Sequence, residues 1–307
     1  MSTVDRRSTV LITGCSADGL GEALALEFHS KGLRVFATAR NTEAMKPLQA
    51  QGIETFELDV TNSDSIASIR SRIEELTGGK LDILVNNAGI SYPYSGADMS
   101  MDKVKALFDV NLFAAMAMVQ SFLPLLLASN HARIVQMGSL AGVMPVPFGA
   151  AYNASKAALH SFGDTLRVEL APFNIKVITL VLGNIQTQLS KPWHRLPENS
   201  IYQPIKDIYQ SRRIDNFQKS AIPREPLVRD IVKEVLKNNP RAWFWGGANA
   251  WVTWFISTFL GRRGFVCIFL VSVTSKRTDE DEKDGIMSKM FGLKKLATLK
   301  AQERKSA

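Results

Sequence analysis

The chain has 307 residues, of which 46% are hydrophobic and 21% are charged. This balance is typical of a globular protein and excludes a largely disordered chain. The formal net charge of +8 is concentrated beyond residue 240, where the chain holds 12 of its 37 basic and 6 of its 29 acidic residues. We therefore expect no nucleic-acid partner for the main body. Two cysteines are too few for a disulfide scaffold, and the polar start predicts no signal peptide.

Short apolar runs alternate with helix-length segments from residue 9 to about residue 182. Runs rich in Val, Ile and Leu that are separated by helices are typical of a parallel sheet buried on both faces. The sequence therefore predicts one α/β domain over residues 8–260, a doubly wound parallel sheet with helices on both faces. The predicted strands are Val10–Thr13, Val35–Ala39, Thr55–Leu58, Leu81–Val85, Ile134–Met137, Val177–Val181 and Arg241–Gly246. The predicted helices include Gly21–Ser30, Ser63–Leu76, Met101–Ala128, Pro226–Asn238 and Ala248–Leu260.

Residues 188–223 are rich in Pro, Gln, Asn and charge, and they show little periodicity. A long irregular insertion in a compact domain is usually a functional lid or a disordered loop. We expect a lid that belongs to the domain. Residues 261–307 form an apolar and basic extension beyond it. Four basic side chains of the lid are interpreted as solvated surface charge, with a substrate phosphate as the alternative: Lys191, Arg195, Arg212 and Arg213.

A glycine-rich turn follows the first strand, and a helix begins at once. Its glycines, Gly14, Gly19 and Gly21, would let backbone N–H groups approach a pyrophosphate at the helix N-terminus. The second strand ends at Arg40 and carries no carboxylate that could bind a ribose 2′-hydroxyl. An arginine at this point suits a 2′-phosphate, so the sequence favours NADPH over NADH.

Further motifs follow in order: Leu58-Asp59-Val60, Asn86-Asn87-Ala88-Gly89, Asn111, Ser139 and Tyr152-Asn-Ala-Ser-Lys156. Together they resemble the short-chain dehydrogenase/reductase family over about residues 8–260. The resemblance implies a Rossmann-like fold, with Asp59 at the adenine, Asn87 beside the adenosine ribose, and Ile185 and Thr187 at the nicotinamide carboxamide. The cofactor residues that it implies are Ile12, Gly14, Ser16, Gly19, Gly21, Thr38, Arg40, Asp59, Asn87, Tyr152, Lys156, Ile185 and Thr187. We expect no metal.

The catalytic prediction rests on the chemistry of carbonyl reduction. Hydride transfer leaves an alkoxide that must receive a proton, and a free tyrosine with a pKa of about 10 is a poor donor near neutral pH. Lys156 lies four residues after Tyr152, on the same helix face, where its charge would favour the phenolate. Ser139 is expected to donate a hydrogen bond to the carbonyl oxygen. Asn111 resembles the family residue that holds a water in the proton relay.

Three positions depart from the family pattern. Four residues separate Gly14 from Gly19 where the family usually has three, and Asp18 falls inside this turn. An inward acid would repel a pyrophosphate, so we expect Asp18 to face solvent. Leu182 replaces a common proline, and Gly138 replaces the serine usually found before the catalytic one.

The substrate is predicted from the resemblance alone. The extended turn, together with the segment from Arg241 to Trp251, is similar to a branch of NADPH-dependent 1-acyldihydroxyacetone phosphate reductases. It implies a lipid-like ketone as the substrate. Retinoid, steroid or secondary-metabolite carbonyl compounds are the alternative, and a non-catalytic NADP(H)-binding regulatory module is the distant one. The resemblance also allows a homo-oligomer.

The C-terminal region suggests a membrane surface. Ala242–Gly261 has 20 residues without a formal charge, but its four tryptophans suit an interface better than a hydrocarbon core. The last 20 residues hold six basic side chains and one acid around four apolar positions, as in a basic amphipathic helix. We expect peripheral association with the cytoplasmic face of the endoplasmic reticulum or of a lipid droplet. A single membrane anchor and a soluble cytoplasmic protein are the alternatives. Phe265–Asp284 interrupts the family sequence and is interpreted as an insertion.

Overall fold

Seven parallel strands form one sheet in the part of the chain that the structure describes, in the order β3-β2-β1-β4-β5-β6-β7. The computed structural model describes residues 7–187, 195–215, 219–261, 264–265, 296, 299 and 302. All seven predicted strands are confirmed, with small shifts at their ends. The strands are β1 (Thr9–Thr13), β2 (Arg34–Ala39), β3 (Glu54–Glu57), β4 (Ile83–Asn86), β5 (Arg133–Met137), β6 (Lys176–Leu182) and β7 (Trp243–Gly246).

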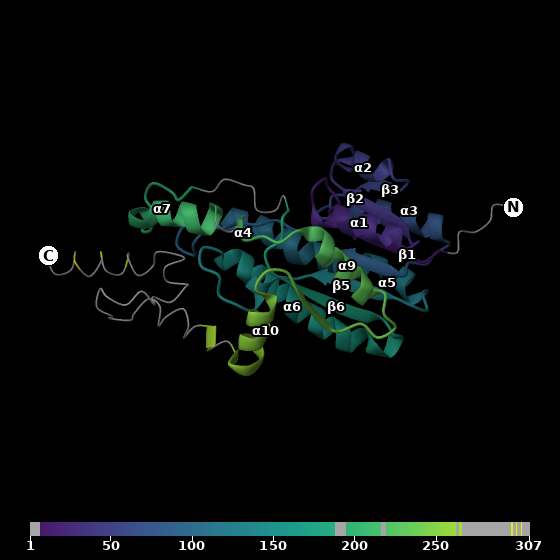
Figure 1. Cartoon of the computed structure of the whole chain (residues 1–307). Helices are drawn as coiled ribbons and strands as arrows, with labels where there is room; N and C mark the ends of the chain where they lie inside the picture. Colours follow the sequence, from purple (N-terminus) through teal and green to yellow (C-terminus); the bar gives the residue numbers. More distant parts are fainter. Residues whose placement is uncertain are drawn as a thin grey trace.

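Helices cover both faces of this sheet (Figure 1). One face carries α1 and α9, whose apolar sides share a core with the sheet. The other face carries α3, α5 and α6. The predicted doubly wound α/β domain is therefore confirmed. The longer helices are α1 (Leu20–Ser30), α3 (Ser63–Thr77), α4 (Met101–Phe108), α5 (Ala114–Leu127), α6 (Ala150–Leu170), α9 (Arg224–Val235) and α10 (Ala250–Phe259), and α2 (Lys46–Gln49) is short.

The apolar runs that predicted the strands contribute side chains to two hydrophobic cores, one on each face of the sheet. In β1, Val10 and Ile12 face the core under α1, whereas Leu11 between them faces the core under α3 and α5. Successive side chains of a strand point to opposite faces, so a strand covered on both sides needs a continuous apolar run. This requirement explains why the strands were visible in the sequence.

The strand order reverses between β1 and β4. From β1 the chain adds β2 and β3 on one side, and then β4 to β7 on the other. In such sheets a ligand binds at the carboxyl ends of the strands, in the crevice where the order reverses. The loops after β1, β4, β5 and β6 therefore define the place of the site.

The predicted helix Met101–Ala128 contains an irregular turn. The structure divides it into α4, a π-helical turn over Asp109–Phe113, and α5. The stretch Met101–Leu127 is long and apolar enough to cross a membrane. It packs instead against α3, β4, β5 and α6. It is therefore a core helix of this domain.

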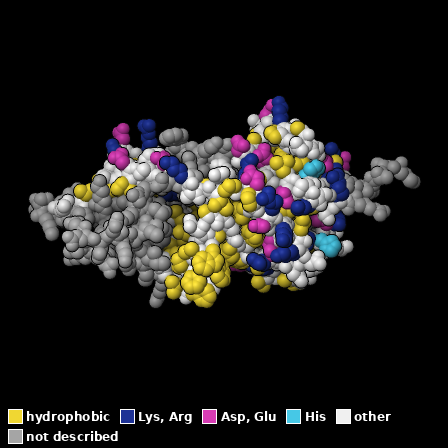
Figure 2. Space-filling model, viewed as in Figure 1, with side chains coloured by type: hydrophobic (Ala, Val, Ile, Leu, Met, Phe, Trp, Pro, Cys, Tyr) yellow, Lys and Arg dark blue, Asp and Glu magenta, His cyan; other side chains and the backbone are white. Residues whose placement is uncertain are grey.

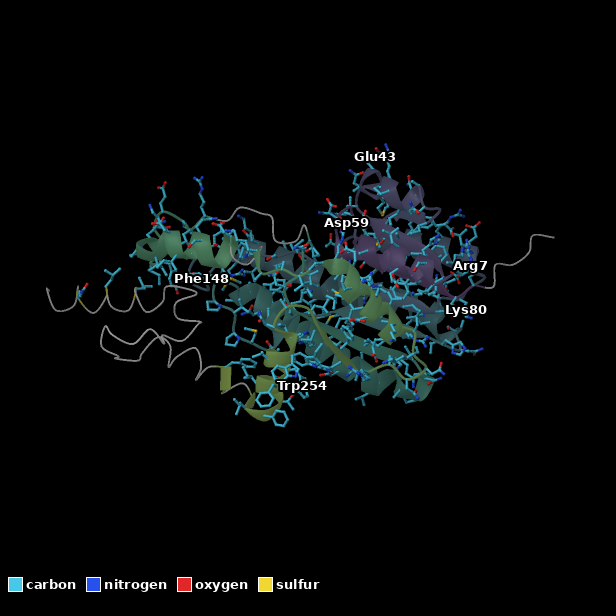
Figure 3. All side chains as sticks on the ribbon, viewed as in Figure 1. Arg7, Glu43, Asp59, Lys80, Phe148 and Trp254 are labelled. Carbon is cyan, nitrogen blue, oxygen red and sulfur yellow. The ribbon has the colours of Figure 1, made fainter. Side chains whose placement is uncertain are left out.

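The lid is helical over Gln203–Asp215, which corrects part of the prediction of an irregular segment; the described residues 195–202 and 220–223 form no helix. Residues 195–215 contain a 3-10 turn at Gln203–Ile205, α7 (Lys206–Ile208) and a π-helical turn at Tyr209–Asp215. The Tyr209 hydroxyl donates to the Pro93 carbonyl at 2.8 Å. The lid packs on an apolar cluster, labelled at Phe148 in Figure 3, whose buried members are Phe148, Leu196, Ile205, Tyr209 and Ile214.

The uncharged stretch Ala242–Gly261 does not form one helix. Its first part is β7, which pairs with β6 inside the sheet, and its second part is α10. The stretch therefore does not have the structure of a single helical anchor. Three other predicted features lie largely outside the described residues: Lys191, the insertion after Phe265, and the basic amphipathic segment near the C-terminus.

Asp82 ties β1 to the end of α5, which leads to a prediction about stability. Its carboxylate accepts hydrogen bonds from the Thr9 N–H at 2.9 Å and from the Ser129 hydroxyl at 2.5 Å. Burial raises the pKa of Asp82, but these hydrogen bonds outweigh burial and hold the pKa below its usual value. We expect Asp82→Ala to lower the free energy of unfolding at pH 7 by about 1–3 kcal/mol, because buried donors lose their acceptor.

The lowered pKa also fixes the direction of the pH effect. A carboxyl whose pKa is lower in the folded state contributes stability above its unfolded pKa of about 3.9, and this contribution is lost as the pH falls through the folded value. Urea unfolding at neutral and acidic pH should therefore show a smaller acid loss for Asp82→Ala than for the unmodified chain. Equal losses would contradict this role of Asp82.

Candidate active site

The turn between β1 and α1 packs so closely that two of its glycines admit no side chain. Gly14 has a φ of 73°, and a Cβ there would lie 2.9 Å from the Ala88 Cα. A Cβ on Gly21 would lie 2.5 Å from the Gly14 carbonyl oxygen. Asn87 fixes the same turn, because its Nδ2 donates to the carbonyl oxygens of Thr13 and Gly14 at 2.7 and 2.9 Å. The Gly-rich turn and the Asn-Asn-Ala-Gly motif are therefore one structural unit.

The first turn of α1 has the features of a phosphate site. Its N-cap is Gly19, which offers no side chain to cap the helix. The first N–H groups of α1 are thus left for an anion, which the helix end favours. Ser16 lies exposed on the same turn, and its carbonyl oxygen accepts the Gly19 N–H at 3.1 Å. These residues fit the pyrophosphate of a dinucleotide.

Asp18 occupies the extra position of the turn and is exposed, as predicted. It adopts a left-handed φ of 58°, and its N–H donates to the Glu22 carboxylate at 2.9 Å. Arg224 of α9 pairs with Glu22 at 3.3 Å and donates to the Gly19 carbonyl at 3.0 Å. No local pattern predicts the pairing of Glu22 with Arg224, because the two residues are far apart in the chain.

Arg40 and Asp59 follow the carboxyl ends of β2 and β3, and Figure 3 labels Asp59. Hydrogen bonds from Thr61 hold the pKa of Asp59 below its usual value, and the nearby Arg40 charge adds to the effect. Arg40 is exposed. Thr38 is uncharged, and its hydroxyl donates to the Ile12 carbonyl at 3.0 Å. The end of β2 therefore presents a cation and no acid, which fits the 2′-phosphate of NADPH.

Four other predicted cofactor residues lie at or near the strand ends. Ile12 and Thr38 are buried within their strands. Ile185 follows β6 and forms a bridge with Ile222, and Thr187 precedes the part of the lid that is not described. Cofactor contacts of these four side chains stay a prediction.

The π-helical turn between α4 and α5 places Asn111 in the site. The Asn111 amide is 1% exposed, and its oxygen accepts the Ile90 N–H at 2.8 Å. Its nitrogen donates to the Ile90 carbonyl at 3.0 Å and to the Ser155 hydroxyl at 3.1 Å. Single π turns inside α-helices occur frequently at functional sites. Here the turn joins the loop after β4 to the helix that carries Tyr152 and Lys156.

Ser139 and Tyr152 lie close together. Ser139 follows β5, and its hydroxyl is near enough to the Tyr152 phenol to lower the pKa of that phenol. Burial nevertheless raises the pKa of Tyr152 above its usual value, because the Ser139 hydroxyl and the charge of Arg213 offset only part of the effect. The two hydroxyls are thus neighbours, as the predicted proton donor and carbonyl-binding group require.

Lys156 lies on the same face of α6, with its Nζ 5.8 Å from the centroid of the Tyr152 ring. The ammonium donates to the Met137 carbonyl at 2.8 Å, and burial lowers its pKa to about 8. A Cβ built on Gly89 would lie 3.3 Å from the Asn111 Oδ1 and 3.7 Å from the Lys156 Nζ. The structure thus brings together all four predicted catalytic residues, and Gly89 keeps open the space between two of them.

His160 is a site residue that the sequence analysis missed. It lies one helical turn after Lys156, is 4% exposed, and its Nε2 accepts the Ser139 N–H at 3.2 Å. A Cβ on Gly138 would overlap the His160 ring, which explains the glycine that replaces the usual serine. The spacing of Tyr152, Lys156 and His160 on one helix face was the signal that could have revealed it.

We expect His160→Leu to lower kcat by about tenfold with little effect on NADPH affinity, because Ser139 would lose the acceptor that orients its backbone. Burial lowers the pKa of His160 to about 4, so the ring is neutral at physiological pH. The unfolded chain takes up this proton near pH 6.5, and stability is therefore lost as the pH falls toward 4. Steady-state kinetics test the effect on kcat. Urea unfolding at pH 7.5 and 5 tests the effect of pH on stability. An unchanged kcat would contradict the first.

Arg213 corrects a second expectation. Its polar segment predicts a solvated surface charge, but its side chain is 8% exposed and its Nε donates to the Pro147 carbonyl at 3.2 Å. Arg195 is exposed, as predicted. The lid therefore brings a buried cation to the Tyr152 region.

Aromatic rings surround the same region. Tyr92 and Tyr94 have ring centroids 4.8 Å apart, and both lie in the apolar cluster that includes Tyr152. Phe148 contacts the rings of Tyr202 and Tyr209 at 5.1 and 5.0 Å. These side chains come from three separate segments, and none of them had a periodic pattern that would have predicted their meeting. The surroundings of Tyr152 are thus largely apolar.

The fold and this site define the class of protein. The model of the short chain dehydrogenase family matches residues 8–197, and the chain belongs to that family. It is 42% identical to the short-chain dehydrogenase srdE of Neurospora crassa over 83% of this chain and 88% of that one. It is 40% identical to the NADPH-dependent 1-acyldihydroxyacetone phosphate reductase of Schizosaccharomyces pombe over 70% of this chain and 77% of that one.

Solved structures agree with this assignment. A short-chain dehydrogenase from Streptomyces avermitilis matches with a TM-score of 0.73 and 25% identity, over 82% of this chain and 92% of that one. A metagenomic short-chain oxidoreductase in complex with NADP matches with a TM-score of 0.54 and 32% identity, over 58% of this chain and 85% of that one. The protein is an NADP(H)-using oxidoreductase of this family, and the glycine turn and Arg40 fit that cofactor.

Proposed function

We propose that the protein reduces the ketone of a hydrophobic, lipid-like substrate with NADPH, and that 1-acyldihydroxyacetone phosphate or a similar lipid is this substrate. The observation that carries the reaction is the meeting of Asn111, Ser139, Tyr152 and Lys156 at the carboxyl edge of the sheet. A degenerate, non-catalytic relative would be expected to lack at least one of these groups. NADPH supplies the hydride when bound.

The side chains of the protein then transfer the proton and stabilise the negative charge. The Ser139 hydroxyl donates to the substrate oxygen as negative charge develops on it. Tyr152 transfers its phenolic proton to the same oxygen, which leaves a phenolate beside the Ser139 hydroxyl. The positive charge of Lys156, held by the Met137 carbonyl, favours that phenolate. In this proposal Asn111 has the role of its family counterpart, to order a water that returns a proton toward Lys156.

Two observations support a lipid-like substrate. The rings of Tyr92, Tyr94 and Phe148 form apolar surroundings near Tyr152. The relative from Schizosaccharomyces pombe is named as a reductase of an acylated ketone phosphate. The aromatic surroundings also favour a second candidate substrate class, ring-containing ketones such as retinoid, steroid or secondary-metabolite carbonyl compounds.

NADPH oxidation by the purified protein distinguishes the candidates. The assay uses palmitoyl-dihydroxyacetone phosphate, a retinal and a steroid ketone, each with the Tyr152→Phe variant as the control for catalysis. Oxidation with the phosphate lipid alone, lost in the variant, is the expected result. Activity confined to the other two would replace the substrate and keep the mechanism. Tight NADPH binding without turnover of any carbonyl compound tested would contradict the enzymatic proposal.

We further propose that α10 rests on the surface of an intracellular membrane, on its cytoplasmic side. Figure 2 shows an exposed apolar patch at the lower edge of the view, where α10 lies in Figure 1. The exposed residues of α10 include Trp251, Phe255 and Phe259. They recur at a spacing of four and form one face, with neighbouring ring centroids 6.1 and 4.9 Å apart. An aromatic face of this kind suits the interface between water and lipid.

Co-sedimentation with vesicles that contain anionic phospholipid tests this proposal. We expect Trp251→Ser combined with Phe255→Ser to reduce the bound fraction several-fold. Phe173→Ser is the matched control, since Phe173 is 59% exposed on a different part of the surface and should not affect binding. Equal binding of all three proteins, or self-association through α10 in the absence of vesicles, would contradict the membrane role.

A further inference from the structure

Arg213 occupies an unusual place for a charged side chain. It belongs to the π-helical turn Tyr209–Asp215 of the lid, and its Nε donates to the Pro147 carbonyl at 3.2 Å. A Cβ built on Gly149 would lie 3.6 Å from its Nη2. Gly149 is the N-cap of α6, and Tyr152 lies in the first turn of that helix. The lid therefore brings the guanidinium to the helix end that carries the catalytic phenol.

The charge of Arg213 is permanent. Burial lowers the pKa of Arg213 from its usual value, but a guanidinium stays protonated in proteins. Two phenols lie near this charge, those of Tyr152 and Tyr209. Tyr209 donates its proton to the Pro93 carbonyl, and burial raises its pKa to about 12. Tyr152, which donates its proton to no backbone carbonyl of the described residues in this way, is therefore the phenol on whose ionisation the charge can act.

Among the residues that the structure describes, two cations near Tyr152 can stabilise its phenolate, Lys156 and Arg213. Lys156 lies on α6 itself, 5.8 Å from the ring centroid, and its ammonium is held by the Met137 carbonyl. His160 is neutral near pH 7. On the neighbouring loop, Asp98 accepts hydrogen bonds from Ser95 and Ser200 and faces Tyr94 and Tyr209. A second cation on the lid side would complement Lys156.

We propose that Arg213 is a positioning residue for the acid–base step, which acts through Tyr152: the lid holds its guanidinium near the phenol, where it stabilises the phenolate left after proton transfer to the substrate. The proposal rests on the acid–base role of Tyr152 in the proposed function. It does not depend on the identity of the substrate. The anchor at Pro147 and the packing of Phe148 under the lid keep the cation in place.

The test is the ionisation of Tyr152, followed by the ultraviolet absorbance of tyrosinate in the full-length protein with NADP bound. Each variant is compared with the same variant carrying Tyr152→Phe, so that the difference reports Tyr152 alone. Arg213→Gln removes the charge and keeps a donor for Pro147, and Arg213→Met removes both. We expect both to raise the midpoint by about one pH unit, since loss of a nearby opposite charge in a buried site disfavours the phenolate.

Two further variants complete the experiment. Arg213→Lys keeps a cation at the same position and should restore most of the unmodified midpoint. Lys206→Met removes an exposed lid cation on α7 and should leave the midpoint unchanged. Thermal unfolding of each variant identifies those that fail to fold, and two neutral variants are included for that reason. Unchanged midpoints in the folded neutral variants, or a shift in Arg213→Lys as large as theirs, would overturn the proposal.

The pH profile of turnover gives a second readout once a substrate is found. In the oxidative direction the rate requires the phenolate, so the neutral variants should move the rise in kcat to higher pH by the same amount as the midpoint. The titration needs no turnover. Failure to find a substrate would therefore count against the proposed function and leave the result for Arg213 intact.

Discussion

Tyr152→Phe is expected to lower kcat by about a thousandfold while NADPH binds with unchanged affinity. The variant keeps the ring, which packs beside Tyr92 and Leu107, and removes only the hydroxyl that lies near Ser139. Loss of a positioned proton donor costs rates of this order. Single-turnover measurements of NADPH oxidation, with NADPH binding followed by fluorescence, separate the chemical step from cofactor binding.

Tyr202→Phe is the matched control for this prediction. Tyr202 also carries its ring in an apolar cluster, against Phe148, but it belongs to the lid. We expect its kcat to remain within about threefold of the unmodified enzyme, since no proton donor is lost. An equal fall in both variants would show that the apolar surroundings, and not the Tyr152 hydroxyl, limit the reaction.

Gly21→Ala is expected to weaken NADPH binding by at least about tenfold. A Cβ at this position would lie 2.5 Å from the Gly14 carbonyl oxygen and 2.6 Å from the Asn87 Nδ2, so the turn must shift. Displacement of a turn fixed by these contacts costs about 1–3 kcal/mol, and the middle of this range corresponds to a change of about thirtyfold in affinity. Titration of the variant with NADPH measures the effect directly.

Gly96→Ala provides the comparison. A Cβ on Gly96 would meet only the Ala150 Cβ at 3.8 Å, an ordinary contact distance, and the residue has no left-handed φ. NADPH affinity should therefore be unchanged in this variant. If Gly21→Ala bound NADPH as tightly as Gly96→Ala, the close packing of the turn would not be what shapes the cofactor site.

The fold and the meeting of the candidate catalytic residues were predictable for a physical reason. A parallel strand covered by helices on both faces must be apolar along its whole length, so β1, β4 and β5 stand out from the segments between them. The reacting groups also lie at short, fixed spacings, such as the four residues from Tyr152 to Lys156 on one helix. Patterns of this kind are local, so they can be recognised in a sequence before it is known which distant segments come into contact.

The features that were missed all depend on contacts between distant segments. Arg213 is buried because the lid packs on Phe148 and Pro147, more than sixty residues earlier in the chain. Arg224 of α9 contacts the phosphate turn through its ion pair with Glu22 and its hydrogen bond to the Gly19 carbonyl. Neither contact leaves a periodic signal, and an arginine in a polar segment is usually exposed. For His160 the four-residue spacing from Lys156 was a local signal, but its contact with the Ser139 N–H was not visible in the sequence.

The π-helical turn at Asp109–Phe113 has a consequence for engineering this protein. A single π turn corresponds to one residue more than a regular α-helix would need, and the surrounding helix loses some of its regular hydrogen bonds. Removal of one residue there would let α4 and α5 join into an unbroken helix, but Asn111 would no longer reach Ile90 and Ser155. Selection for heat resistance alone would therefore favour a straightened and catalytically poor helix, so thermostability screens should hold residues 109–113 fixed.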